Sequence, residues 1–81
     1  MEYNRFYIIF ASMFYRGIND INDLLKTNNI FEAKSFSSRE LAEKHFRHLC
    51  EDGVYLGGNM VHPEEKEFSI VEYKVNYTSV P

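Results

Sequence analysis

The chain has 81 residues and a formal net charge of −3, and 44% of its residues are hydrophobic, with 16% aromatic. This length predicts a single domain over residues 1–81, and the apolar share is that of a folded globular protein rather than a disordered chain. The slight acidic excess disfavours a protein that binds the nucleic-acid backbone, because such proteins usually carry a surplus of Lys and Arg.

The first predicted element is a strand over residues 5–15, a run rich in aromatic and β-branched side chains. Side chains at both odd and even positions of this run are apolar, which is typical of a strand covered on both faces. Gly17 is expected to end the strand. The pattern leaves open whether the chain itself or a binding partner covers the second face.

Residues 18–29 are polar and rich in Asn and Asp. Four apolar side chains in this segment have helical spacing and predict a short helix near residues 21–27: Ile18, Ile21, Leu24 and Leu25. A structured loop is the alternative for the same residues. Residues 30–36 are then predicted to form a second strand that leads into the main helix.

The clearest local signals predict a helix over about residues 38–52. Ser37 followed by Glu40 has the spacing of a capping box, and Gly53 can take the left-handed conformation that ends a helix. One face of this helix is apolar and is formed by Leu41, Ala42, His45, Phe46, Leu49 and Cys50. Such a face needs a flat apolar surface to pack against.

The remaining residues predict two further strands. The third strand begins at Val54, and Gly57 and Gly58 interrupt it with a bulge or a turn. Pro63 marks the turn that precedes the last strand, over residues 67–77. The apolar positions change parity midway along this last strand, which is what a β-bulge produces.

The order of these elements predicts an α+β fold. About four mostly antiparallel strands form one sheet, with the helix of residues 38–52 packed on one face. One helix of this length covers only part of such a sheet. Unless residues 18–29 cover the second face, the sheet keeps an apolar surface that is available to another molecule.

No set of residues predicts a catalytic, metal or cofactor site. His45, His48 and Cys50 are metal-type side chains on one helix, but Cys50 points about 160° away from His48 around the helix axis. Cys50 also lies near the helix C-terminus beside Glu51 and Asp52, where the pKa of its thiol is expected to rise. We therefore expect no enzyme, no metal and no cofactor, with a metal-stabilised domain as the distant alternative.

The single cysteine and the N-terminal residues indicate in which cellular compartment the protein is expected. Cys50 cannot form a disulfide within the chain, so nothing indicates an oxidising environment. The first residues lack the pattern of a signal peptide, and the apolar run of residues 6–15 is much shorter than the ~20 residues of a membrane helix. We expect a soluble cytoplasmic protein.

The tyrosine content predicts a binding surface, because protein interfaces favour Tyr. We expect the partner to be another protein, such as a host target, or a second copy of the chain. The predicted aromatic contacts are Tyr7, Tyr15, Tyr73 and Tyr77, and Glu64 and Glu65 are predicted to orient the partner by charge. The alternative is a nucleic-acid-binding module that stacks bases on the sheet aromatics.

The chain is small, has no catalytic set and is rich in Asn, Ile, Lys, Phe and Tyr. In this general character it resembles the small accessory proteins that bacteriophages and mobile elements encode, including anti-CRISPR proteins and other inhibitors of host functions. The resemblance implies a mechanism without catalysis, in which a folded protein binds a host protein and blocks its active surface.

Overall fold

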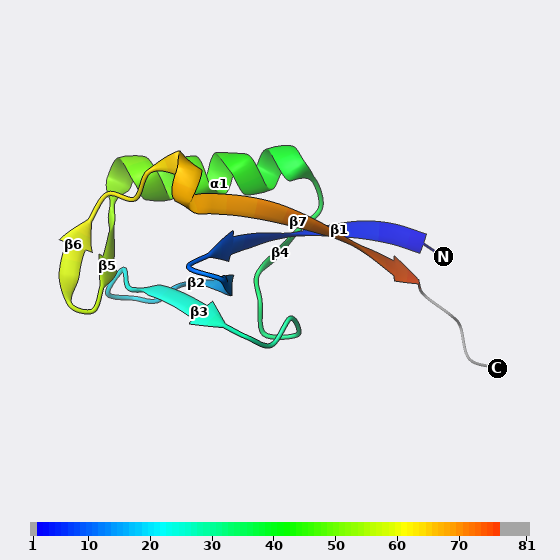
Figure 1. The fold of residues 1–81 in the computed structure, drawn as a ribbon, viewed down its shortest axis with the longest axis horizontal. Helices are drawn as coiled ribbons and strands as arrows, with labels where there is room; N and C mark the ends of the chain where they lie inside the picture. Colours follow the sequence, from blue (N-terminus) through cyan, green and yellow to red (C-terminus); the bar gives the residue numbers. More distant parts are fainter. Residues whose placement is uncertain (1, 77–81) are drawn as a thin grey trace.

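The computed structural model describes residues 2–76 of the chain and the side chains of residues 3–74. This part of the chain forms an α+β fold, in which one main helix packs on a five-stranded antiparallel sheet and a separate two-stranded hairpin lies at one end (Figure 1). In chain order, the elements are β1 (Glu2–Phe10), β2 (Met13–Ile18), β3 (Leu24–Thr27), β4 (Ser35–Phe36), α1 (Arg39–Asp52), β5 (Val54–Leu56), β6 (Asn59–Val61), the 3-10 turn η1 (Glu65–Glu67) and β7 (Phe68–Asn76).

β1 is the central strand of the sheet. β7 pairs with one edge of β1 along its whole length, from Phe10 opposite Phe68 to Glu2 opposite Asn76. β2 and β4 share the other edge of β1, and β3 pairs with β2 outside it. Towards the amino end of β1, the β1–β7 pair extends past the other strands as a two-stranded ribbon (Figure 1).

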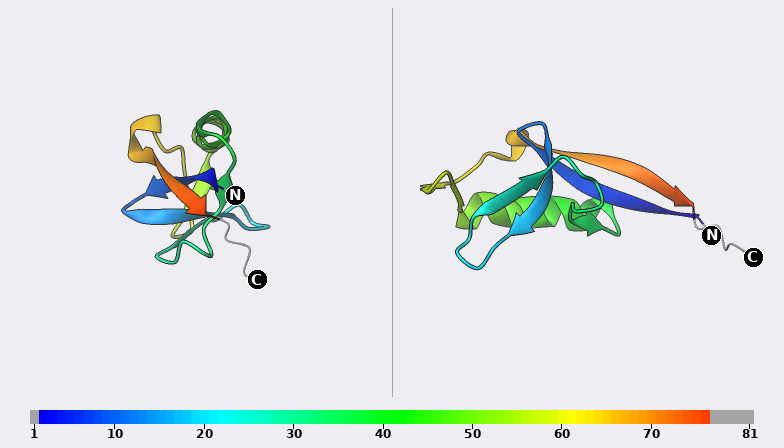
Figure 2. Two further views of the ribbon diagram at one scale, coloured as in Figure 1. Left: turned by 90° about the vertical axis from the view of Figure 1, so that its right-hand side faces the viewer. Right: turned by 90° about the horizontal axis from the view of Figure 1, so that it is seen from below.

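The core lies between α1 and one face of the sheet (Figure 2). Even-numbered side chains of β1 and β7 point towards the helix, because alternate residues of a strand face opposite sides. Phe46 of α1 stacks on Phe68 of β7, with ring centroids 5.2 Å apart and ring planes 5° apart. The buried hydrophobic side chains are Ile8, Phe10, Tyr15, Leu24, Ala42, Phe46, Leu49, Val54 and Phe68.

The helix begins one residue later than its sequence signal indicates. Ser38, rather than Ser37, is the N-cap, and its Oγ accepts a hydrogen bond from the amide of Leu41 at 3.2 Å. Gly53 ends the helix at a φ of 82°, and its amide donates to the carbonyl of Leu49 at 2.9 Å. A side chain at Gly53 would meet neighbouring atoms at 2.9–3.0 Å, so the positive φ and the lack of space both require glycine there.

Ser38→Ala is expected to lower the free energy of unfolding by about 0.5–2 kcal/mol, because the first turn of α1 loses a hydrogen-bond acceptor. Ser37→Ala is the matched control, since it removes the same hydroxyl group one residue before the cap. Urea denaturation followed by circular dichroism measures both values. A larger loss for Ser37→Ala than for Ser38→Ala would contradict the observed cap.

The predicted strand of residues 5–15 is instead two strands joined by a tight turn. β1 ends at Phe10 and β2 begins at Met13, and the residues between them, Ala11 and Ser12, have φ values of 51° and 63°. Positive φ at both central residues is typical of a type I′ hairpin turn, which usually contains Gly, Asn or Asp. Gly17 lies inside β2, next to a shift in its register with β3, rather than after the strand.

The predicted short helix at residues 21–27 is wrong, because Leu24–Thr27 is β3, an edge strand paired with β2. The Asn19 side chain accepts hydrogen bonds from the amides of Ile21 and Asp23 at 3.1 and 2.9 Å. These bonds hold the residues before β3 in a turn. The segment therefore widens the sheet and does not form a layer over its second face.

Two later strands also differ from their predictions. Only Ser35–Phe36 of the predicted strand over residues 30–36 is a strand. The last strand, predicted over residues 67–77, is β7, and its register with β1 is continuous, without the predicted β-bulge. The change of parity arises because both faces of β7 carry apolar side chains, Phe68 and Ile70 on one and Val71 and Tyr73 on the other.

The β5–β6 hairpin stands apart from the main sheet. Gly57 and Gly58 form its turn, which is one of the two alternatives that the sequence predicted. The amide of Tyr55 donates to the carbonyl of Asn22 at 3.0 Å, and the side chain of Asn22 donates to the carbonyl of Gly53 at 3.0 Å. These bonds fix the hairpin against the turn between β2 and β3.

Candidate functional site

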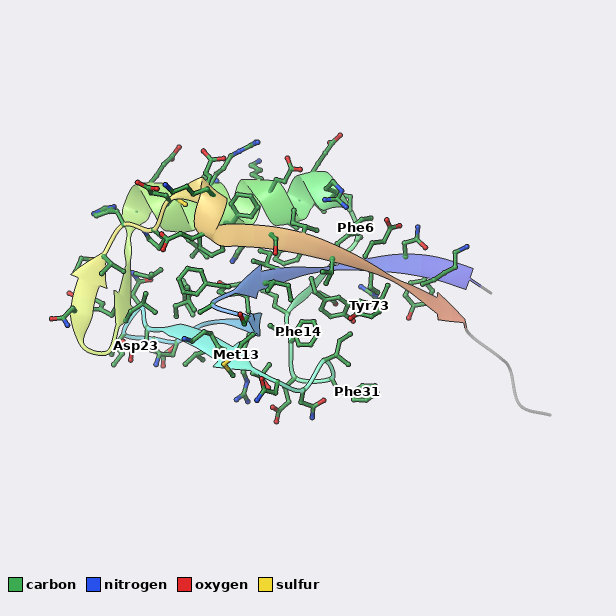
Figure 3. All side chains as sticks on the ribbon, viewed as in Figure 1. Phe6, Met13, Phe14, Asp23, Phe31 and Tyr73 are labelled. Atoms are coloured by element: carbon green, nitrogen blue, oxygen red, sulfur yellow. The ribbon has the colours of Figure 1, made fainter. Side chains whose placement is uncertain are left out.

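The face of the sheet that points away from α1 carries three aromatic rings in mutual contact. Tyr7 of β1 lies 5.8 Å from Phe14 of β2 and 5.8 Å from Tyr73 of β7, between ring centroids. Phe14 and Tyr73 are 6.5 Å apart. Figure 3 shows Phe14 and Tyr73 on the side of β1 and β7 that faces away from α1. We call these three rings the aromatic surface.

Strand register explains why these rings meet. Ile8 and Phe10 point into the core, so the odd-numbered Tyr7 points to the opposite face of β1. Tyr73 stands opposite Arg5 in the continuous β1–β7 register, which places its ring next to Tyr7. Rings in edge-to-face contact stabilise each other by about 0.5–1.5 kcal/mol per pair. These contacts therefore favour the observed arrangement of the three rings.

The chain covers the aromatic surface only in part. The Tyr73 side chain is 46% exposed, while Tyr7 and Phe14 are half-buried against each other. Neither a helix nor a second sheet of residues 2–76 packs over this face (Figure 2). Part of the aromatic surface is therefore open to solvent.

Phe31 adds a fourth ring on the same side of the sheet (Figure 3). Its side chain is 94% exposed, at the outer end of the loop between β3 and β4. The Thr27 hydroxyl accepts from the Asn29 amide at 3.0 Å and donates to the Glu32 carboxylate at 2.8 Å. The Asn29 side chain accepts from the Phe31 amide at 3.0 Å. The loop therefore holds Phe31 outwards through its own hydrogen bonds.

The structure separates the four tyrosines that the sequence singled out. Tyr7 and Tyr73 lie together in the aromatic surface. Tyr15 is fully buried on the opposite face, where its hydroxyl and His45 Nε2 share a hydrogen bond of 2.7 Å, so it is not available as a surface contact. Burial raises the pKa of Tyr15 to about 12. Tyr77 lies outside the described residues.

Glu64 and Glu65 lie beside α1, on the other side of the sheet from the aromatic surface. The Glu65 carboxylate pairs with Arg47 at 3.2 Å, and the Glu64 carboxylate pairs with Lys66 at 3.0 Å. All four side chains are exposed, and exposed ion pairs contribute little to stability. These carboxylates are therefore not part of the same surface as Tyr7 and Tyr73.

Two members of the candidate site, Phe14 and Phe31, were not predicted from the sequence. The sequence places Phe14 in the same predicted strand as Tyr7. The hairpin turn instead puts Phe14 on β2, next to β1, where its ring contacts Tyr7. Phe31 was assigned to a strand over residues 30–36. The Asn28-Asn29 pair just before it is a turn signal, since Asn side chains often bond to their own backbone two residues on, and that signal could have placed Phe31 in a loop.

The thiol of Cys50 lies near several carboxylates. Burial raises the pKa of the Cys50 thiol, and the nearby carboxylates of Glu65, Glu67 and Glu51 raise it further. The Cys50 carbonyl lies 3.1 Å from His62 Nδ1, so this histidine contacts the backbone rather than the thiol. Among residues 2–76, no group of three or more His, Cys, Asp or Glu side chains is placed to hold a metal ion.

A shallow groove of about 530 Å³ lies between the amino half of β1 and the start of α1. Arg5 and Arg39 line it, and each guanidinium already lies over a ring of β1, that of Tyr3 at 5.0 Å and that of Phe6 at 5.9 Å. The groove is open to solvent along the stretch of β1 that β4 does not reach. It offers charge and apolar surface without an enclosed cavity.

Comparisons of the chain with protein-family models, with curated proteins and with solved structures found no match. None of the helices in the described part of the chain has the length and apolar character needed to cross a membrane. The aromatic surface and the Phe31 loop are therefore the features from which we infer a function.

Proposed function

We propose that this chain is a small, non-enzymatic cytoplasmic protein that binds another protein by direct contact and so regulates or inhibits it, as its resemblance to phage-encoded inhibitors implies. The main support is the exposure of Phe31 on a loop held in place by its own hydrogen bonds. Burying a Phe side chain is worth about 1.5–3 kcal/mol. The free chain does not gain this burial free energy, because the loop keeps the ring in water. A partner that covers the ring would gain it on binding.

The aromatic surface suits a protein partner better than stacked bases. Its rings contact each other edge to face, at 66° between Tyr7 and Phe14 and 78° between Tyr7 and Tyr73. Base stacking needs exposed ring faces, and rings at these angles do not form one flat platform. Protein interfaces instead use Tyr and other aromatic residues as compact anchors surrounded by less important contacts.

The test compares three single variants: Tyr73→Ala, Phe31→Ala and the control Tyr55→Ala. Affinity purification from the native cell identifies the partner, and titration calorimetry with that partner measures the dissociation constant of each variant. We expect Tyr73→Ala and Phe31→Ala each to weaken binding at least about tenfold, which corresponds to about 1.4 kcal/mol. Tyr55 is 37% exposed on the β5–β6 hairpin, so Tyr55→Ala removes a similar ring elsewhere and should leave binding unchanged.

The outcomes separate the proposal from its alternatives. Circular dichroism spectra that match the unmodified chain show that each variant is folded. Equal binding by all three variants would reject the aromatic surface and Phe31 as the contact. Binding of DNA or RNA that weakens steeply as salt is added would instead support the nucleic-acid alternative, because counterion release gives that dependence.

A further inference from the structure

β7 is a long edge strand. Within residues 2–76 it pairs with β1 alone, over nine residues, so the backbone groups of its outer edge face away from the sheet (Figure 1). An open edge of this length is a ready template for pairing with another strand. Charged side chains commonly protect such edges, and β7 carries two, Glu72 and Lys74.

We propose that the outer edge of β7 pairs with the same edge of a second copy of this chain, antiparallel, about a two-fold axis at Tyr73. A two-fold axis that joins two antiparallel strands into one continuous sheet must pass between equivalent residues, because opposed residues have to point to the same face. Each possible axis is therefore defined by the one residue of β7 that stands opposite the same residue of the second copy.

The charges of β7 select one of these axes. An axis at Glu72 places two carboxylates opposite each other, and an axis at Lys74 places two ammonium groups opposite each other. An axis at Tyr73 places Glu72 opposite Lys74 of the second copy, and by symmetry this favourable pair forms twice. No other axis within Phe68–Asn76 brings opposite charges together. The charges of this edge are thus complementary to those of the same edge in a second copy in this register.

The same register joins the aromatic surfaces of the two copies. Tyr73 of one copy stands opposite Tyr73 of the other, at the ~4.5–5.5 Å Cβ separation of cross-strand neighbours. Tyr7 and Phe14 already contact Tyr73 within each copy, so the three rings of each copy continue into one aromatic band. Glu72 and Lys74 point to the α1 face, because they alternate with Tyr73. The proposed dimer forms through the edge of β7, whereas the proposed partner contacts the aromatic surface and Phe31. Dimerisation can therefore be tested without changing any of these rings.

Charge exchange at residues 72 and 74 tests this dimer. Size-exclusion chromatography with light scattering should show a dimer for the unmodified chain. Glu72→Lys and Lys74→Glu alone each place like charges across the axis, and each should weaken dimerisation about tenfold or more, since two symmetric pairs change sign at once. The double variant restores complementarity and should dimerise again. A mixture of the two single variants should form a heterodimer, because its facing charges are opposite.

Glu51→Lys is the matched control, since it makes the same charge change on the exposed end of α1 and should leave the dimer intact. If Glu72→Lys does not fold, Lys74→Glu and the double variant still give the comparison. A strict monomer of the unmodified chain at its highest soluble concentration would overturn the inference. A dimer that neither single variant weakens, or that the double variant does not restore, would overturn this register.

Discussion

Replacing Phe46 with Ala is expected to lower the free energy of unfolding by about 3–5 kcal/mol. The Phe46 side chain is only 8% exposed and stacks on Phe68 between the helix and the sheet. Removing it leaves a cavity where α1 meets β7, and the stacked ring loses its partner. A domain has a total stability of about 5–15 kcal/mol, so a loss of this size removes a substantial share of it.

Phe31→Ala is the control for Phe46→Ala, because it removes the same side chain from a position that is 94% exposed. We expect this control to change the free energy of unfolding by no more than about 0.5 kcal/mol. Urea denaturation measures both free energies of unfolding, with the same dependence on urea concentration fitted for the two variants. Similar losses for the two variants would contradict the packing of α1 on the sheet. A large loss for Phe31→Ala alone would show that Phe31 is a core residue rather than an exposed one.

The main helix could be predicted because its signals are local. A capping serine, a terminating glycine and an apolar stripe lie within seventeen residues of one another, and each acts through neighbours three or four positions away. The observed helix, Arg39–Asp52, differs from the prediction of residues 38–52 by one residue. The α+β class followed from the same local signals and is confirmed.

The hairpin turn at Ala11 and Ser12 could not be predicted, and it decides which tyrosines reach the surface. In one continuous strand, Tyr7 and Tyr15 would share a face, because both positions are odd. The turn instead places Phe14 opposite Ile9, so Phe14 joins the outer face and Tyr15 turns into the core. The two strands pair across a turn in which two non-Gly residues have positive φ, and no local pattern in the sequence indicates that pairing.

The same limit applies to the short strand β3. The spacing of Ile21, Leu24 and Leu25 fits a helix, yet Leu24 is buried in the core and residues 24–27 pair with β2 as a strand. Four residues cannot show a helical period clearly, and tertiary pairing overrides weak propensity. Tyr73, in contrast, is predicted to lie on the surface of the sheet, and it is 46% exposed on the face of β7 that points away from the core.

Tyr15→Phe is expected to lower the free energy of unfolding by about 1–3 kcal/mol at neutral pH, because it leaves the half-buried His45 imidazole without its hydrogen-bond partner. In the folded chain, the Tyr15 hydroxyl and His45 Nε2 are 2.7 Å apart and the ring centroids are 5.3 Å apart. The phenol donates when the other ring nitrogen carries the proton. Phenylalanine keeps the ring in the core, so packing is retained and the measured loss reports the hydrogen bond.

The pH dependence of the free energy of unfolding tests whether His45 is the side chain whose hydrogen bond Tyr15→Phe removes. Burial lowers the pKa of His45 below its ordinary value of 6.5, and the charges of Lys34 and His48 lower it further. The unfolded chain therefore takes up a proton near pH 6.5 while the folded chain does not. Stability is complete above that pH and falls as the pH decreases towards the pKa of the folded state.

His45→Gln should remove this part of the acid loss, whereas His62→Gln, at an exposed position, should keep it. Tyr15→Phe should lower stability in the unmodified background at neutral pH and should lower it much less in a His45→Leu background, because leucine offers the Tyr15 hydroxyl no hydrogen-bond partner. Chemical denaturation from pH 5 to pH 8 measures all of these values. Equal losses from Tyr15→Phe in both backgrounds would mean that the loss does not come from the bond to His45, and this part-buried hydrogen bond would then not contribute to the stability of the fold.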